Sequence, residues 1–197
     1  MIRRQWVLVL IALGAAAADA AVTRIDIQKR ETYAGPGFGS VGAYERIVGR
    51  FHGELDPGHP LNKDIVDIGL APRNARGRVE YSSDLEIIKP VDLAKGNGAL
   101  LYDVNNRGNK IALGSFNDAP SGNNPVKPDD LGNGFLMRQG FTVLWSGWIQ
   151  DIPAANNTLR IQLPVAPGLA QNVWDELLPN VRNAMSFPLS FKAAGTD

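Results

Sequence analysis

A short polar loop after an apolar run is the feature of this sequence that most strongly suggests chemistry. Residues 99–104 have the composition and length of a strand, and the polar residues 105–110 follow them. In parallel α/β sheets, the loops after the carboxyl ends of strands carry the functional groups. Backbone N–H groups in such a loop can stabilise an oxyanion. The alternative is a solvated turn that ends at Gly108, with Arg107 and Lys110 on the surface, since polar turns are common.

The serines and histidines do not form a recognisable catalytic pattern. Ser115, Ser121 and Ser146 are expected in loops, but no G-x-S-x-G turn surrounds any serine. His52 and His59 both precede the polar loop, and each is most simply interpreted as a surface or turn residue. Acyl transfer needs an activated nucleophile, a general base and oxyanion donors. The sequence offers only the donors, so we assign no catalytic residue within this chain.

Two further motifs do not support a cofactor or a metal. Residues 37–42 read G-x-G-x-x-G, but a dinucleotide site needs an apolar strand before this motif and a helix after it. We interpret them as a Gly-rich turn between strands. The run from Asp103 starts like a calcium loop, yet Gly114 stands where a glutamate ligand is required. The sequence has no cysteine, which excludes zinc sites built on thiolates. We therefore predict neither a cofactor nor a metal.

The elements that position the polar loop are mostly strands. Alternating apolar and polar residues predict strands over 22–30, 44–55 and 79–89 in the first half of the chain. We predict further strands over residues 99–104, 141–145, 159–165 and 186–192. A helix is expected between the strands at 99–104 and 141–145, so these two strands should be parallel and belong to one sheet.

The connecting helix is predicted over residues 129–139. Aspartates after Pro128 can cap its start, and Gly140 suits the position just past its end. Gly132 and Gly134 oppose the helix, because glycine inside a helix costs about 1 kcal/mol relative to alanine. We expect its first turn to be irregular. The predicted fold class is α/β, with a β-rich first half followed by a strand–helix–strand unit.

The N-terminus predicts export. Two arginines precede an apolar stretch at residues 6–13, and Ala18-Asp19-Ala20 is a small-residue cleavage sequence. The apolar core is shorter than the roughly 20 residues that span a bilayer. We therefore predict a signal peptide over residues 1–20, with cleavage between Ala20 and Ala21. The mature protein is expected to be periplasmic or secreted, with no stable membrane insertion.

The composition narrows the classes of partner. The 20 Lys and Arg residues are balanced by 20 Asp and Glu residues, so no basic excess favours nucleic acid or an anionic membrane. The 21 glycines and 13 prolines among 197 residues indicate a fold rich in loops. Without cysteine, an exported domain has no disulfides and needs a hydrophobic core of its own.

Several segments resemble a bacterial family of exported α/β-hydrolase domain proteins. The similar segments are GAYERIVG at 42–49, residues 101–110, residues 133–151, NVWDE at 172–176 and LSFKAAGTD at 189–197. The resemblance covers nearly the whole chain after residue 20, although none of these motifs is a catalytic signature. It implies that the loop after the strand at 99–104 supplies an oxyanion-hole N–H. By this resemblance, Asn106, Arg107 and Gly108 are the candidate donors.

The same resemblance implies a nucleophile and a catalytic histidine that this sequence lacks. In α/β-hydrolases the nucleophile precedes the acid and the acid precedes the histidine, but this sequence has no nucleophile turn and no late histidine. We expect residues 21–95 to be a β-rich region and residues 96–197 to be the start of a truncated α/β-hydrolase-like domain. The chain would be part of an esterase or acyl hydrolase, inactive alone, with a small-molecule substrate bound through the full-length protein. A non-catalytic, β-rich exported binding or structural module is the alternative.

Overall fold

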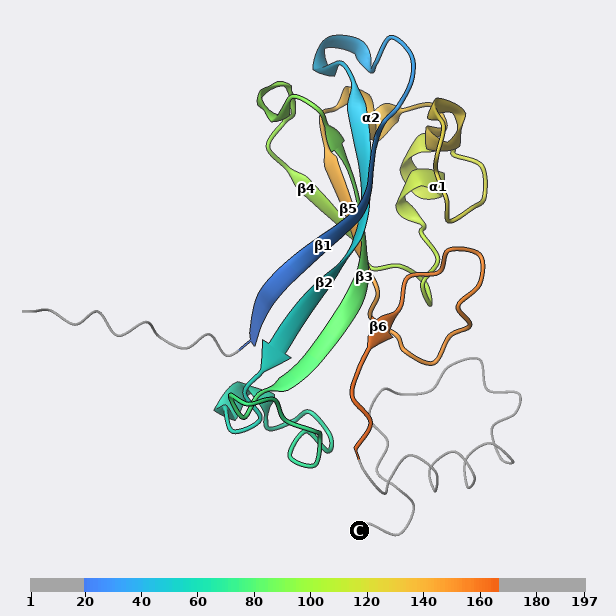
Figure 1. Ribbon diagram of the computed structural model, residues 1–197. Helices are drawn as coiled ribbons and strands as arrows, with labels where there is room; N and C mark the ends of the chain where they lie inside the picture. The colour runs from blue at the N-terminus through green and yellow to red at the C-terminus, as the bar shows by residue number, and fades with distance from the viewer. Residues whose placement is uncertain (1–19, 167–197) are drawn as a thin grey trace, which may run out of the picture.

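The computed structural model describes residues 20–166, which form a β-rich mixed α/β fold around one sheet (Figure 1). In this part of the chain, five strands of a six-stranded sheet run in the order β1-β2-β3-β5-β4, and the sixth, β6, pairs with β3 off this path. Residues 1–19 of the predicted signal peptide and the predicted strand over 186–192 lie outside the described residues. The strands are β1 Ala20–Thr32, β2 Tyr44–Leu55, β3 Val79–Pro90, β4 Leu100–Asp103, β5 Thr142–Ser146 and β6 Ile161–Gln162.

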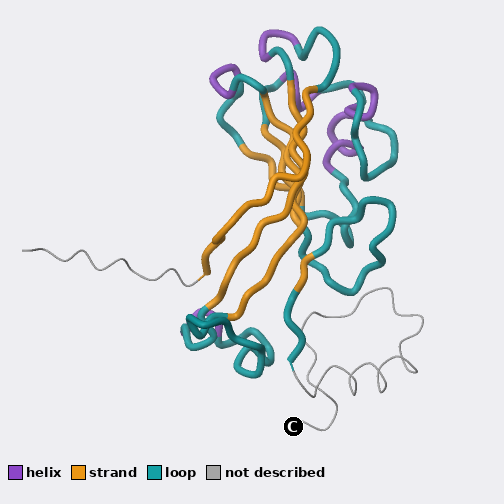
Figure 2. The backbone as a smooth tube through the Cα atoms, in the orientation of Figure 1, coloured by secondary structure: helices purple, strands orange, loops and turns teal. Residues whose placement is uncertain are grey.

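Three long strands, β1 to β3, make up the first half of the described fold, as predicted, and they pair in the antiparallel sense. β1 is longer than the predicted strand over 22–30 and has register shifts near residues 23 and 28. Such bulges increase the local twist, and Figure 2 shows the long strands twisting together. The motif at residues 37–42 forms a turn between β1 and β2 that contains a short 3-10 helix, Gly39–Val41, as we interpreted it.

β4 and β5 are parallel neighbours, which confirms the prediction from the strand–helix–strand pattern. Leu100 is paired with Thr142, and Asp103 is paired with Trp145. β5 also pairs with β3 in the antiparallel sense. The domain boundary expected near residue 95 therefore lies within one continuous sheet. β4 is at the end of the strand order, and the side chain of Leu100 is exposed there.

The connection between β4 and β5 differs from the single helix predicted over residues 129–139. A helix that was not predicted, α1 (Ala112–Asn117), comes first. The predicted region then divides into a 3-10 helix, Pro128–Leu131, and the one-turn α2 (Phe135–Arg138). Gly132 and Gly134 separate the two pieces with φ angles of 60° and 70°. These angles are outside the helical region, so the prediction of one continuous helix is wrong.

The side chain and carbonyl of Asn117, at the end of α1, explain this interruption. The Asn133 N–H donates to the Asn117 carbonyl at 2.7 Å, and the Leu136 N–H donates to Asn117 Oδ1 at 2.9 Å. Asn117 Nδ2 donates to the Leu131 carbonyl at 2.9 Å. Asn117, 14 to 19 positions away in the chain, thus satisfies backbone groups that a continuous helix would pair internally.

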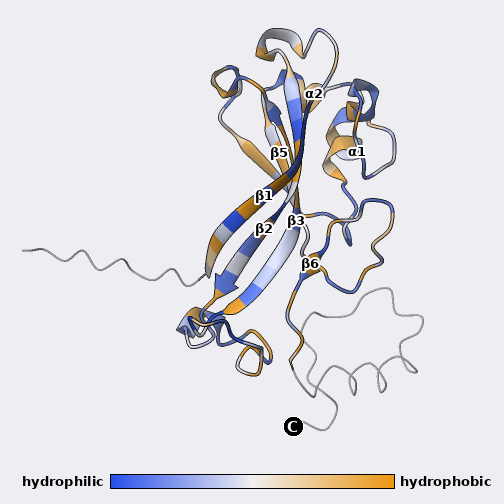
Figure 3. Cartoon of the chain, viewed as in Figure 1, coloured by the Kyte–Doolittle hydropathy of each residue, from blue (hydrophilic) through white to orange (hydrophobic). Residues whose placement is uncertain are grey.

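The hydrophobic core lies between one face of the sheet and the connection that contains α1 and α2. Trp145 and Val143 of β5, Ile88 of β3 and Met137 of α2 are fully buried in it. α1 and the segment leading to β6 lie on the same side of the sheet (Figure 1). At the other end of the strand order, β1 carries its apolar residues in its first part, and its last five residues, 28–32, are all polar. Figure 3 shows the strand coloured by hydropathy.

β6 is shorter than the strand predicted over residues 159–165. Only Ile161 and Gln162 pair with β3. The neighbouring Arg160 N–H donates to the Asp84 side chain at 2.9 Å. The carboxylate thus accepts the hydrogen bond that a backbone carbonyl of β3 would accept in a continued strand. The alternating pattern therefore predicts the presence of this strand but overestimates its length.

Glu45 on β2 should make the fold sensitive to acid. Its side chain is 4% exposed and lies 2.6 Å from both Arg30 Nε and Lys89 Nζ. Hydrogen bonds from Arg30, and then from Lys89, hold the pKa of Glu45 below its usual range, although burial opposes them. The unfolded chain then binds this proton more tightly than the folded chain. The stabilisation is present at neutral pH and is lost as the pH falls below about 5.

Glu45→Gln is therefore expected to flatten the fall in unfolding free energy between about pH 5 and pH 3. Urea unfolding of both proteins at several pH values measures this slope. Parallel curves for the wild type and the variant would show that Glu45 does not contribute to the acid dependence.

Candidate functional site

The polar loop after β4 contains a tight hairpin turn at residues 106–109. The Asn106 N–H donates to the Asn109 carbonyl at 2.9 Å, and the Asn109 N–H donates to the Asn106 carbonyl at 3.0 Å. Arg107 and Gly108 occupy the central positions, with φ angles of 48° and 81°. Two central residues with positive φ are typical of a type I′ turn, which favours glycine. A Cβ atom at Gly108 would also lie 2.6 Å from Ile152 Cδ1, so the packing requires glycine as well.

Asn105 fixes this turn to the end of β5. Its side chain is buried, and its Oδ1 accepts the Gly108 N–H at 2.8 Å while its Nδ2 donates to the Ser146 carbonyl at 2.6 Å. Trp148 Nε1 donates to the Asn105 carbonyl at 2.8 Å. On the other side of the turn, the Leu159 N–H donates to the Gly108 carbonyl at 3.0 Å. The turn is therefore held from several directions.

The three candidate oxyanion donors lie together in this turn but differ in availability. The N–H groups of Asn106 and Gly108 donate to internal acceptors. The Arg107 N–H has no acceptor among residues 20–166. The Arg107 guanidinium lies 3.9 Å from the Asp151 carboxylate. Of the three residues, Arg107 is thus the one whose amide is free to donate to a substrate, and the oxyanion role itself stays a prediction.

Asp103, where the sequence resembles a calcium loop, has a structural role. Its Oδ2 accepts hydrogen bonds from the Ile111 N–H at 2.9 Å, the Ala112 N–H at 2.8 Å and Trp145 Nε1 at 2.5 Å. Two of these donors are at the start of α1, so the carboxylate caps that helix from β4. Residues 20–166 contain no group of three or more histidine or acidic side chains that could hold a metal ion.

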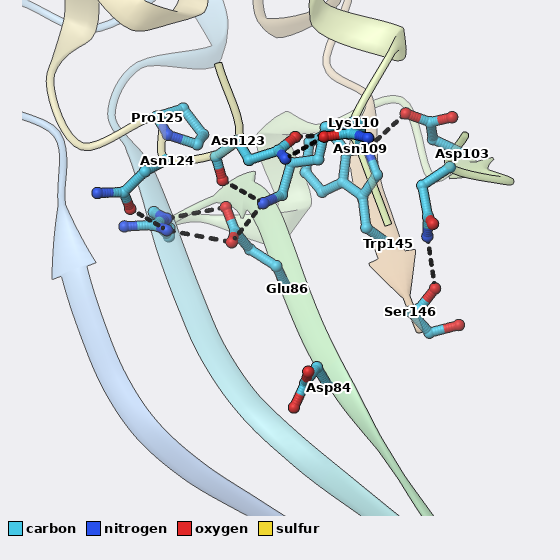
Figure 4. A network of polar contacts seen from close by, with 12 residues as sticks. Asp84, Glu86, Asp103, Asn109, Lys110, Asn123, Asn124, Pro125, Trp145 and Ser146 are labelled. Atoms are coloured by element: carbon cyan, nitrogen blue, oxygen red, sulfur yellow. Dashed lines mark hydrogen bonds and ion pairs between the residues drawn. The ribbon is translucent and has the colours of Figure 1, made fainter. Parts of the chain in front are cut away.

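Three charged side chains are buried together, and we call them the ion cluster: Arg46, Glu86 and Lys110. Figure 4 labels Glu86 and Lys110 of this cluster. Glu86 Oε2 lies 3.0 Å from Lys110 Nζ, and Glu86 Oε1 lies 2.9 Å from Arg46 Nε. The exposed fractions of the Arg46, Glu86 and Lys110 side chains are 6%, 3% and 2%. The sequence interpretation that placed Lys110 on the surface is therefore wrong.

The loop around residue 123 covers the ion cluster. Lys110 Nζ donates to the Asn123 carbonyl at 2.5 Å, and Arg46 donates to Asn124 Oδ1 at 2.8 Å. Burial lowers the pKa of Lys110 from its usual value, while the Glu86 carboxylate opposes this shift. Because Lys110 directly follows the turn and is enclosed by partners, we assign it to positioning the turn.

The candidate serines and the histidines remain apart in the described residues. His52 Nε2 contacts Asp26 Oδ2 at 2.9 Å, and His59 Nδ1 accepts the Leu61 N–H at 3.2 Å. Ser146 Oγ contacts the Tyr102 hydroxyl at 2.7 Å. Within residues 20–166, none of Ser115, Ser121 and Ser146 is hydrogen-bonded to a histidine. The described part of the chain therefore contains an unpaired backbone N–H in the turn but no hydrogen-bonded pair of a candidate serine and a histidine.

No known family model, curated protein or solved structure matches this sequence. None of the helices in residues 20–166 is long and apolar enough to cross a bilayer.

Proposed function

We propose that this chain is the N-terminal part of an exported acyl hydrolase of the α/β type and that its turn at residues 106–109 supplies an oxyanion donor. The observation that carries the proposal is the free Arg107 N–H at the carboxyl end of β4, beside the parallel strand β5. Open α/β sheets bind their substrates at the carboxyl ends of their parallel strands. An amide fixed in a rigid turn stabilises developing charge without reorganising.

In the proposed chemistry, this chain supplies the oxyanion donor, and polypeptide outside this sequence supplies the nucleophile and the base. Attack on an ester carbonyl moves negative charge onto the carbonyl oxygen, and the Arg107 N–H donates a hydrogen bond to that oxygen. Asn105 keeps the donor in place through its bonds to Gly108 and Ser146. The nucleophile and the base come from outside this sequence, because it contains no G-x-S-x-G turn and both of its histidines precede β4.

A fluorophosphonate probe, which labels activated serines, tests this division. The purified chain should show no label, Ser146 included, because no base is placed beside that serine. A longer protein, expressed from the same gene and extended beyond Asp197, should be labelled on a serine among the added residues. A label on Ser146 of the present chain, or a gene that ends at Asp197, would contradict the proposal. A non-catalytic module would leave both proteins unlabelled.

The donor itself is tested in the extended protein at residue 107. Replacing the Arg107 backbone amide by an ester removes the N–H, and kcat should fall roughly 10²- to 10³-fold, as for the loss of one oxyanion donor. Arg107→Gly retains the N–H and accepts a positive φ, so it should retain most of the activity. An unchanged kcat in the ester-substituted protein would exclude the Arg107 donor.

The N-terminal residue of the mature protein tests the predicted export. N-terminal sequencing of the periplasmic or secreted product is expected to begin at Ala21, because residues 1–20 have the charge pattern and cleavage sequence of a signal peptide. Recovery of the intact protein, beginning at Met1, from the soluble cytoplasm would contradict this expectation.

A further inference from the structure

A second polar site lies beside the turn, in a cleft of about 810 Å³. The loop after β4, α1, the loop around residue 121 and residues 156–157 form its walls. Its volume is within the range of about 300–1,000 Å³ that small-molecule sites occupy. The cleft is thus large enough for a ligand and is formed by segments that are far apart in the sequence.

The uncharged polar side chains of this cleft have hydrogen-bonding capacity to spare. Among residues 20–166, the side chains of Ser115, Ser121, Asn156 and Asn157 form no hydrogen bonds. Asn124 uses its Oδ1 to accept from Arg46, and its Nδ2 has no acceptor in the described structure. Hydroxyl and amide groups can each donate and accept. Together these side chains match a ligand rich in hydroxyl groups.

The two charged side chains in the wall of the cleft, Lys110 and Asp130, already have partners within the protein. Lys110 Nζ is ion-paired with Glu86 at 3.0 Å, and its side chain is buried. Asp130 Oδ2 accepts the N–H groups of Val126 and Lys127 at 2.9 and 3.0 Å. No uncompensated positive charge remains in the cleft to select a phosphate or a carboxylate. The geometry therefore favours a neutral ligand.

The cleft also offers apolar contacts and a fixed loop. Ile111, Leu113 and Ala119 contribute apolar atoms to its lining. Thr158 Oγ1 donates to the carbonyls of Pro153 and Ala155 at 2.8 and 2.9 Å, which closes the loop that carries Asn156 and Asn157. A pyranose combines hydroxyl groups around its rim with apolar C–H faces, so it complements both the polar and the apolar groups of this lining.

We propose that this cleft binds a neutral saccharide of about two rings. The proposal does not depend on acyl hydrolysis, because it concerns binding by side chains that belong to this chain. A failure of the hydrolase proposal would therefore leave it unchanged.

Nuclear magnetic resonance titration of the full chain tests the proposal, with cellobiose, maltose and N,N′-diacetylchitobiose as probes. At least one disaccharide should shift the side-chain amide signals of Asn124, Asn156 and Asn157 in a saturable way. If none of the three produces saturable shifts at the cleft, or if the shifts map elsewhere, the proposal is overturned. Tighter binding of glucose 6-phosphate than of any neutral probe would overturn the assigned ligand class.

Matched variants locate the binding. Ser121→Ala combined with Asn157→Gly removes two polar groups, and glycine accepts the φ of 54° at residue 157. The dissociation constant should rise roughly tenfold or more, as expected for the loss of two hydrogen bonds. Gln28→Ala removes an exposed amide on β1 and should leave the dissociation constant unchanged. Unchanged affinity in the double variant, with its other signals intact, would contradict the site.

Discussion

Glu86→Gln is expected to lower the free energy of unfolding by about 3–5 kcal/mol, although the two side chains have nearly the same shape. The reason is electrostatic, because the substitution leaves Arg46 and Lys110 buried without their shared counter-charge. Urea unfolding measures the loss. Glu80→Gln removes a carboxylate from an exposed position on the same strand, and its effect should stay within about 0.5 kcal/mol. Equal effects of the two substitutions would show that the ion cluster does not stabilise the fold.

A double-mutant cycle separates the contribution of Lys110 from that of Arg46. Lys110→Met in the Glu86→Gln background removes one of the two uncompensated charges, so part of the lost stability should return. We expect a coupling free energy of at least about 1 kcal/mol between positions 86 and 110, since their side chains are in direct contact. Strictly additive losses would contradict the pairing.

Gly132→Ala is expected to cost about 3 kcal/mol of unfolding free energy, from backbone strain and overpacking together. Residue 132 has a φ of 60°, and a Cβ atom there would lie 2.2 Å from the Asn117 carbonyl oxygen. That oxygen accepts the Asn133 N–H, so it cannot move away without losing a hydrogen bond.

Gly114→Ala is the matched control for this substitution. Gly114 lies within α1, and a Cβ atom there would have no neighbour within 4 Å. Alanine is the better helix former, so this substitution should raise the free energy of unfolding by about 0.5–1 kcal/mol. The two glycines are expected to respond with opposite signs, and responses of the same sign would contradict the structure at residue 132.

The strands could be predicted from the sequence because their pattern is local. Alternation of apolar and polar residues gives β2 its observed bounds, Tyr44–Leu55, and places β3 to within one residue. The helices could not be predicted in the same way. α1 depends on the Asp103 carboxylate, and α2 depends on Asn117, so in both cases the decisive partner comes from another element.

The candidate site could be predicted only in part from local sequence patterns. Gly108 and its position after a strand identify the turn at residues 106–109, because turn chemistry is local. The burial of Lys110 was missed, since it requires β3 and the loop around residue 123 to meet over its side chain. One indication was available in the sequence. Glu86 lies between the apolar residues Leu85 and Ile87 in a predicted strand, and a charge in such a run often has a buried partner.

The order of the strands also determines when the turn can form during synthesis. Because β5 lies between β3 and β4, β4 has no neighbour in the sheet until residues 142–146 have been made and have joined β3. At a translation rate of about 5–20 residues per second, the roughly 40 residues between them take about 2–8 seconds to appear. Throughout this interval β4 and its exposed Leu100 are an unpaired apolar segment on a growing chain. The residues of the turn at 106–109 are thus among the last of the described fold to reach their positions.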